Sequence, residues 1–155
     1  MGDERRLVEF AQRARATEHF MARLAYEVKR AERYKRSFSV LVLSPKRTPV
    51  RDLFNRVRPW MRNTDIVEVI ERRGPAAAAF LEVDAPPSGQ GPADERPMKV
   101  VAVLPEANGR TAQIVAVKLK GCLTHMPDVA IGFAGYPEDG TDPLELLRAA
   151  AANPA

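Results

Sequence analysis

The segment Phe38–Leu43, with the sequence FSVLVL, decides the fold of this chain. It carries no charged residue, and basic residues lie on both sides of it, with Arg36 before and Lys46 after. A short apolar run bounded in this way is typical of a strand that is buried on both faces. Such strands lie inside a sheet that helices cover. We therefore expect a central strand here, with Ser44 just beyond its carboxyl end, where α/β and α+β enzymes often place their chemistry.

The composition is that of one soluble globular domain. The chain has 155 residues, of which 45% are hydrophobic and 28% are charged. No apolar run approaches the roughly 20 residues that a membrane-spanning helix needs, and no apolar stretch follows the charged start of the chain, so we expect no membrane contact and no secretory signal. A cytoplasmic protein is predicted. The net charge of +4 is spread among acidic residues, and the most basic segment, 29–36, is typical of a solvated helix surface rather than of a nucleic-acid-binding stripe.

Residues that could hold a metal or carry redox chemistry are sparse. Cys122 is the only cysteine, so it cannot form an internal disulfide, and we expect it to be a small buried apolar residue. His19 and His125 are far apart and have no spacing that resembles a zinc site. The sequence therefore predicts no cofactor and no metal site.

Hydrophobic periodicity predicts an alternation of helices and strands. Helices are expected over 3–36, 49–63, 111–126 and from Asp142 onward, and strands over 38–43, 65–70, 99–104 and 129–136. On the second helix, Trp60 continues the apolar stripe and is expected in the core, while Pro59 bends the helix. This order predicts an α+β fold of the ferredoxin-like kind, with helices crossing a mainly antiparallel sheet.

Two segments extend beyond this plan. The first predicted helix is either one long helix or two nearly continuous ones, and its first half either projects toward a partner or packs as an ordinary helix. Between the second and third strands, residues 76–83 extend the strand ladder, and residues 84–97, which are rich in Pro and Gly, form a flexible insert.

Several stretches of the chain resemble the GGDEF (diguanylate cyclase) family. Residues 129–149, VAIGFAGYPEDGTDPLELLRA, resemble the last strand of that family, its turn and the following helix. Residues 20–43, which end in ERYKRSFSVLVL, resemble its opening helix and first strand. RNTDIV at 62–67 and VAVLP at 101–105 resemble the flanks of its signature hairpin. The resemblance implies a GGDEF-like domain over 17–150, with 1–16 as an N-terminal helical extension and 151–155 as a tail.

The resemblance also implies that the catalytic machinery is lost. Active members of the family place a metal-binding Asp where Ser44 stands, and the segment that holds their guanine is missing before Asp65. The signature Gly-Gly-Asp/Glu-Glu-Phe is replaced by ERRGPAAAAF at 71–80. Phosphoryl transfer needs carboxylates that hold Mg²⁺ against the triphosphate, and a backbone cradle beside it. We expect neither here, and therefore no diguanylate cyclase activity.

One motif of the family survives. Arg62 and Asp65 match the Arg-x-x-Asp motif with which active cyclases bind their product, cyclic di-GMP, as an inhibitor. An arginine can fork two hydrogen bonds onto a phosphate or a guanine edge, and an aspartate accepts from guanine N–H groups. The same two residues are equally suited to a helix-to-strand turn. The family usually adds a further arginine, for which the candidates are Arg72, Arg73 and Arg110.

Three hypotheses about function follow. The preferred one is a non-catalytic regulatory module that contacts another protein or a second copy of itself through its N-terminal helix. The second is a cyclic di-GMP receptor that binds through Arg62 and Asp65. The third is an enzyme with altered chemistry, for which the sequence offers no replacement set of carboxylates, histidine or nucleophile. The residues expected to form an interaction surface in the first case are Leu7, Phe10 and Ala14, or Phe80 and Leu81.

Overall fold

The computed structural model describes residues 2–70 and 98–153, with side chains from Thr17 onward. The helices are α1 (Gly2–Tyr34), α2 (Val50–Val57), α4 (Gly109–Cys122) and α5 (Pro143–Ala152), with a short 3-10 helix, η1 (Arg58–Trp60), after α2. The strands are β1 (Phe38–Ser44), β2 (Ile66–Ile70), β3 (Lys99–Pro105) and β4 (Ala130–Tyr136). The expected ladder over 76–83, with Phe80 and Leu81, and the insert at 84–97 lie outside the described residues.

The strands form one antiparallel four-stranded sheet in the order β2-β3-β1-β4. Strand β1 lies inside this sheet, where Leu41 pairs with Ala102 of β3 and with Phe133 of β4. All six residues of Phe38–Leu43 are buried. The predicted α+β fold with a buried first strand is therefore confirmed.

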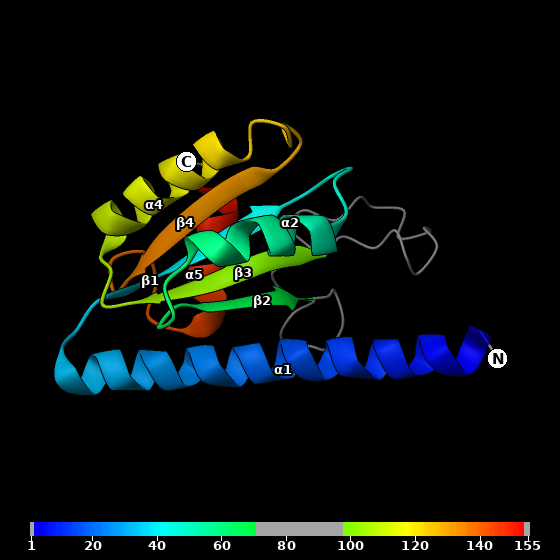
Figure 1. Ribbon diagram of the computed structural model, residues 1–155. Coiled ribbons are helices and arrows are strands. Elements are labelled where there is room, and N and C mark those ends of the chain that lie inside the picture. Colours follow the sequence, from blue (N-terminus) through cyan, green and yellow to red (C-terminus); the bar gives the residue numbers. More distant parts are fainter. Residues whose placement is uncertain (1, 71–97, 154–155) are drawn as a thin grey trace.

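Helices cover both faces of the sheet (Figure 1), and each face carries its own hydrophobic core. Alternate residues of β1 supply both: Val40 belongs to the core under α1 and α5, and Leu41 to the core under α2 and α4. This alternation follows from the period of two in a strand. The largest side chains that α1, α2 and α5 bury completely are Phe20, Leu24, Leu53, Leu146 and Leu147.

Helix α1 is one continuous helix of 33 residues, which answers the question that the sequence left open. Its second half packs on the sheet beside β2, with Leu24 and Val28 in the core. Toward its N-terminus the helix runs on past the end of β2 (Figure 1). The expected extension over residues 1–16 thus joins the rest of α1 without a break at residue 17.

The prediction that Trp60 lies in the core is wrong. Helix α2 ends at Val57, and the chain continues as the tighter 3-10 helix that contains Pro59. Because a 3-10 helix has three residues per turn, the apolar stripe of α2 is not continued. Trp60 is 62% exposed, and Met61 is buried instead. Cys122 also differs from its prediction, because it is half-buried at the end of α4 and not fully buried.

The start of α5 forms as its sequence predicts. Asp142 is the N-cap and accepts a hydrogen bond from the backbone N–H of Glu145 at 3.1 Å, and Pro143 occupies the first turn. Helix α5 then packs closely on β4 at Gly132, where an added Cβ would lie 1.7 Å from the carbonyl oxygen of Ala150. Among the described residues, no helix is long and apolar enough to cross a membrane.

Candidate functional sites at the two ends of the sheet

The carboxyl end of β1 holds a buried lysine. Ser44 is the last residue of β1 and Lys99 is the first residue of the antiparallel strand β3, so the two lie at the same end of the sheet. The Lys99 side chain is 2% exposed, and its Nζ donates a hydrogen bond to Ser44 Oγ at 2.9 Å. An ammonium group at this position opposes the binding of a divalent cation. Ser44 and Lys99 therefore do not fit a Mg²⁺ ion.

Acidic ligands are also scarce over the rest of the described chain. Within residues 2–70 and 98–153, no group of three or more His, Cys, Asp or Glu side chains is placed to hold a metal ion. His19 lies on the surface and faces Glu68 of β2, with Nδ1 3.8 Å from Oε1. Burial raises the pKa of the Glu68 carboxyl, and the neighbouring His19 opposes that rise.

The loop after β1 contacts the loop before β4. The backbone N–H groups of Lys46, Arg47 and Thr48 all donate to Oδ2 of Asp128, at 3.1, 2.7 and 2.8 Å. The Thr48 hydroxyl donates to Oδ1 of the same carboxylate at 2.6 Å. These N–H groups converge on a carboxylate of the same chain, so Asp128 joins the two loops.

The Arg62–Asp65 motif forms a tight turn before β2. Asp65 Oδ2 accepts a hydrogen bond from the backbone N–H of Arg62 at 2.8 Å, and Asp65 N–H donates to the Arg62 carbonyl at 3.0 Å. The Asp65 carboxylate thus has the structural role that the sequence left open for it. The guanidinium of Arg62 is exposed and forms no ion pair with any residue that the structure describes.

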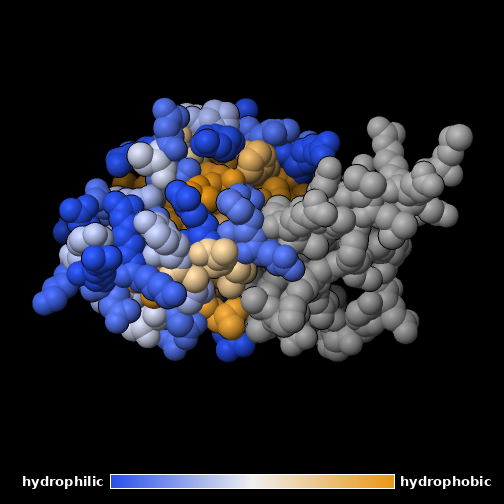
Figure 2. Space-filling view, turned by 90° about the horizontal axis from the view of Figure 1, so that it is seen from below, coloured by the Kyte–Doolittle hydropathy of each residue, from blue (hydrophilic) through white to orange (hydrophobic). Residues whose placement is uncertain are grey.

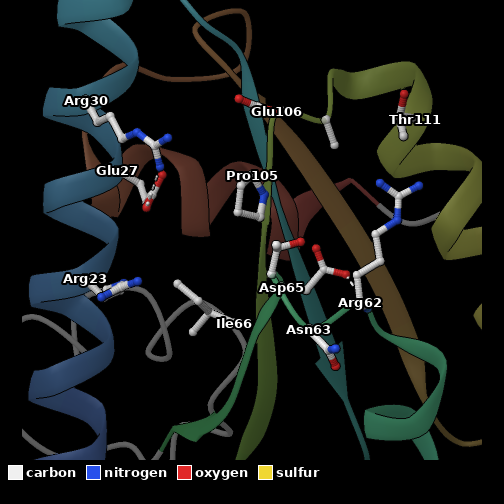
Figure 3. Close-up of a pocket in the computed structure, with 12 residues that line it drawn as sticks. Arg23, Glu27, Arg30, Arg62, Asn63, Asp65, Ile66, Pro105, Glu106 and Thr111 are labelled. Atoms are coloured by element: carbon white, nitrogen blue, oxygen red, sulfur yellow. Dashed lines mark hydrogen bonds and ion pairs between the residues drawn. The ribbon is translucent and has the colours of Figure 1, made fainter.

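Arg62 lines an open groove of about 620 Å³ between α1, β2 and the start of α4. Figure 3 shows Arg62 extending toward Thr111, while Arg23 and Arg30 project from α1 on the opposite side. The apolar side chains of Ile66 and Pro105 lie between these two basic walls. The other residues that line the groove are Glu27, Asn63, Thr64, Asp65, Glu106 and Ala107.

The acidic residues of the groove are already engaged. Glu27 is 5% exposed and lies 3.9 Å from Arg30 on the same helix. Glu106 pairs with Arg36. Glu106 also has a φ of 62°, a left-handed conformation that is uncommon for a residue other than glycine and that costs free energy. With these partners in place, the groove presents the guanidinium groups of Arg23 and Arg62 without a described ion-pair partner.

The sequence patterns predict only part of this groove. They indicate Arg62 and Asp65 but not Arg23 and Arg30, which the spacing i, i+7 places on one face of α1. Of the further arginines that were candidates, Arg110 does not line the groove, and Arg72 and Arg73 lie outside the described residues. The seven-residue spacing of Arg23 and Arg30, with Glu27 one turn before Arg30, is the sequence pattern that could have indicated this basic face of α1.

Among the residues whose side chains the structure describes, the large exposed apolar ones lie on three elements, α1, η1 and α4. They are Tyr26, Tyr34, Trp60, Ile114 and Val117. The part of the molecule that Figure 2 draws in colour is mainly hydrophilic, with apolar groups visible between charged ones. The expected interaction residues on α1 are Leu7, Phe10 and Ala14. The structure places their backbone in the helix but does not describe their side chains.

Comparison with known proteins identifies the fold. No family model matches the chain, and no curated protein matches it. Among solved structures, it is similar to the GGDEF domain of YfiN (TpbB) from Pseudomonas aeruginosa, with a TM-score of 0.60 and 19% identity over 87% of this chain and 84% of the other. The fold is that of a GGDEF domain. A sensory box/GGDEF family protein from Caulobacter crescentus matches with a TM-score of 0.54 and 15% identity, over 86% of this chain and 85% of that one. A DGC protein from Thermotoga maritima matches with a TM-score of 0.53 and 14% identity, over 90% and 94%.

On this GGDEF fold the two candidate sites lie at opposite ends of the sheet. Ser44, Lys99 and the loop at 46–48 lie where β1 ends and β3 begins. The groove lies at the other end, where β2 begins at Ile66 and β3 ends at Pro105. A ligand in the groove therefore does not contact Ser44, and the two sites can be tested separately.

Proposed function

We propose that the chain is a non-catalytic GGDEF-like regulatory module of bacterial signalling that acts in the cytoplasm through contact with another protein or with a second copy of itself. The observation that carries the proposal is the hydrogen bond of 2.9 Å from buried Lys99 to Ser44. A cyclase needs a carboxylate-held Mg²⁺ to neutralise the triphosphate. At this position the chain instead supplies a hydroxyl and an ammonium.

The catalytic half of the proposal is tested with GTP and Mg²⁺. We expect no cyclic di-GMP product and no Mg²⁺-dependent change in the thermal midpoint of the protein. Replacing Ser44 alone by Asp should restore neither, because a single carboxylate beside the buried Lys99 does not supply the oxygen ligands that Mg²⁺ needs. Formation of cyclic di-GMP from GTP by the wild-type protein would refute the proposal.

The interaction half is tested on helix α1. The double variant Leu7→Asp with Phe10→Asp should dissociate a self-assembled protein, or abolish capture of its partner, without a change in the folded domain. Its control is Arg5→Asp with Gln12→Asp, which the spacing of the sequence places on another side of the same helix. The measurement is molar mass by light scattering together with partner capture. If the Leu7/Phe10 variant behaves as the wild type does in both, α1 is the wrong surface.

A second function is favoured by the groove, namely that of a receptor for cyclic di-GMP. This ligand has two phosphates and two guanines. Arg62 on one wall and Arg23 with Arg30 on the other offer forked donors at separate points of an open groove. Ile66 and Pro105 offer apolar contacts for a base between them. The Asp65 carboxylate still has lone pairs for guanine N–H groups beside the hydrogen bond from Arg62 N–H.

Calorimetric titration with cyclic di-GMP tests the receptor. Binding in the micromolar range that Arg62→Ala weakens at least tenfold is expected. The matched control is Arg58→Ala, because Arg58 is also exposed and lies four residues earlier but does not line the groove. The absence of heat at high protein concentration would leave Arg62 and Asp65 as turn residues and leave the interaction module as the function. Equal weakening by both variants would show that net charge, and not the groove, binds the ligand.

A further inference from the structure

The outer face of helix α4 carries apolar side chains where a surface helix normally carries polar ones. Ile114 and Val117 lie three residues apart on this helix, and they are 51% and 57% exposed. Helix α4 packs on β1 and β4 and buries Ala112, Ala116 and Leu119. At 3.6 residues per turn, Ile114 and Val117 lie on the side of the helix opposite to these three. A helix that packs on a core has polar residues on that side, so α4 exposes apolar area that the fold itself does not use.

Gly121 continues the same line along the helix. It follows Ile114 at i+7 and Val117 at i+4, so the three residues share the outermost side of α4. Nothing lies within 4 Å of a Cβ added at Gly121, so packing inside the chain does not require a glycine there. Glycine inside a helix costs free energy relative to alanine, but it lets another backbone approach closely. The spacing i, i+3, i+7 with a glycine at its end is therefore suited to a second helix that packs across α4.

Basic residues flank this apolar line. Lys118 lies on one side of it, Lys120 on the other, and Arg110 at its start, and all three are exposed. Arg110 and Lys118 form no ion pair with any residue that the structure describes. The sequence from 107 to 127 contains no acidic residue, and Glu138 approaches α4 only at its first residue. The outer face of α4 thus combines an apolar line with positive charge on both sides.

We propose that this outer face of α4 docks an acidic amphipathic helix of another protein. The partner places apolar residues over Ile114 and Val117 and carboxylates beside the flanking cations, as residues beside the seam of paired helices do. A second copy of the chain does not fit, because a two-fold contact through α4 brings like charges together. A lipid surface gains nothing from the close approach that Gly121 permits. The inference rests on the proposed function, since it assumes contact with another protein, and it adds a surface that is separate from α1.

The test uses a synthetic peptide as the probe. The peptide has about 20 residues, enough to form a helix, with leucine at i, i+3 and i+7 and glutamate on both sides of the leucines. Titrated into the full chain, it should bind in the micromolar range and shift the amide resonances of residues 110–121. Sodium chloride should weaken it, because salt screens exposed charges. A second peptide in which lysine replaces glutamate should not bind.

The apolar line is tested by a double variant. Ile114→Gln with Val117→Gln should weaken the acidic peptide at least about tenfold. The urea midpoint of the protein should not fall, because both side chains are exposed. The matched control is Tyr26→Gln, which removes an apolar side chain of similar exposure, 60%, from α1. The control should bind the peptide as the wild type does.

The flanking charges and the glycine are tested in the same titration. Arg110→Gln with Lys118→Gln should also weaken the acidic peptide about tenfold. Its control is Arg51→Gln with Arg56→Gln, which removes two exposed cations from α2 and should leave the binding close to that of the wild type. Gly121→Ala should weaken the peptide although it stabilises α4, because the new Cβ holds a partner helix away. A residue with a merely structural role would not separate binding from stability in this way.

Several results would overturn the proposal. It fails if the acidic and basic peptides bind equally, if neither binds at millimolar concentration, or if the control variants lose as much affinity as the α4 variants. It also fails if the resonances of residues 110–121 respond to protein concentration alone, which indicates a second copy, or to vesicles containing phosphatidylglycerol but not to the peptide, which indicates a lipid surface. Leu7→Asp with Phe10→Asp should leave peptide binding unchanged, so the results for α4 and for α1 can be told apart.

Discussion

At the scale of single residues, Gly132 sets how closely α5 approaches the sheet. A Cβ at this position would lie 1.7 Å from the Ala150 carbonyl oxygen and 3.1 Å from that of Asn153. Both atoms belong to the backbone, so α5 would have to move as a whole. We expect Gly132→Ala to lower the free energy of unfolding by about 3 kcal/mol, at the upper end of the usual cost of overpacking.

Gly121 is the matched control for that prediction. It is exposed near the end of α4, and nothing lies within 4 Å of an added Cβ. Gly121→Ala should stabilise the protein by roughly 0.5–1 kcal/mol, because alanine is the better helix former. Urea unfolding of the two variants and the wild type measures both effects. A loss below about 1 kcal/mol in Gly132→Ala would contradict the close contact between α5 and β4.

Asp128 should make the stability of the protein depend on pH only in acid. Hydrogen bonds from Thr48 and Arg47 lower its pKa in the folded state below the value of 3.8 that is expected for an unfolded chain. Its contribution is therefore fully present above about pH 4 and is lost as the pH falls toward the lower pKa of the folded state. The difference in unfolding free energy between wild type and Asp128→Asn should be the same at pH 7 and pH 5.5.

Measurement at pH 3 completes that comparison. There the difference should be smaller, because the carboxylate of the unfolded chain is protonated and the advantage of the folded state declines. Chemical denaturation at the three pH values gives the three differences. A difference that disappeared between pH 7 and pH 5.5 would contradict the lowered pKa of Asp128.

At the scale of elements, the start of α5 depends on its cap. Asp142 accepts from Glu145 N–H, and the Glu145 carboxylate accepts from Thr141 N–H at 3.1 Å. Asp142→Ala should cost about 1 kcal/mol, which is typical of a lost N-cap. Hydrogen exchange of the amides in the first turn of α5 should speed up.

Asp52→Ala in the first turn of α2 is the control. Because Asp52 makes no cap hydrogen bond, this substitution should lower the free energy of unfolding by less. Equal costs would mean that helix dipole interactions alone account for Asp142.

The positions of the elements could be predicted because each has its signal in adjacent residues. FSVLVL carries no charged residue and forms the buried strand β1. The N-cap Asp142, followed by Pro143 and Glu145, predicts the start of α5. The failure at Trp60 has a local cause as well, since Pro59 permits the 3-10 turn that ends the stripe of α2. Periodicity indicates where apolar residues recur. It does not indicate where an α-helix gives way to a 3-10 helix, which has fewer residues per turn.

At the scale of the whole molecule, the sites could not be predicted in full because distant segments build them. Arg62 and Asp65 share a local motif, but Arg23 and Arg30 join them only because α1 lies along β2. Thr48 and Asp128 meet although 80 residues separate them. The resemblance to GGDEF domains placed Ser44 at the end of β1, but the pairing of this residue with Lys99 depends on the register of β1 against β3. Sequence patterns indicate elements, and only the packing of elements brings such residues together.

The same packing predicts where the folded unit begins. Helix α1 packs on the sheet through Phe20, Leu24 and Val28, which belong to its second half. Toward its N-terminus, α1 runs past the end of β2 (Figure 1). A chain that starts at residue 17 should therefore fold with an unfolding free energy within about 1 kcal/mol of the full chain. A chain that starts at residue 33 should not fold, because the loss of each large buried side chain costs roughly 2–5 kcal/mol against a total stability of roughly 5–15 kcal/mol.

Circular dichroism and urea unfolding of the two shortened chains measure these outcomes, and light scattering of the same samples adds the oligomeric state. If residues 2–16 carry the interaction surface, the chain that starts at residue 17 should be a folded monomer that no longer captures a partner. A folded chain that retains the assembly or partner of the full protein would move the interaction surface to the remaining exposed elements. Loss of folding on removal of residues 2–16 would instead make the whole of α1 part of the core domain, since a helix that only projects from a domain does not determine its stability.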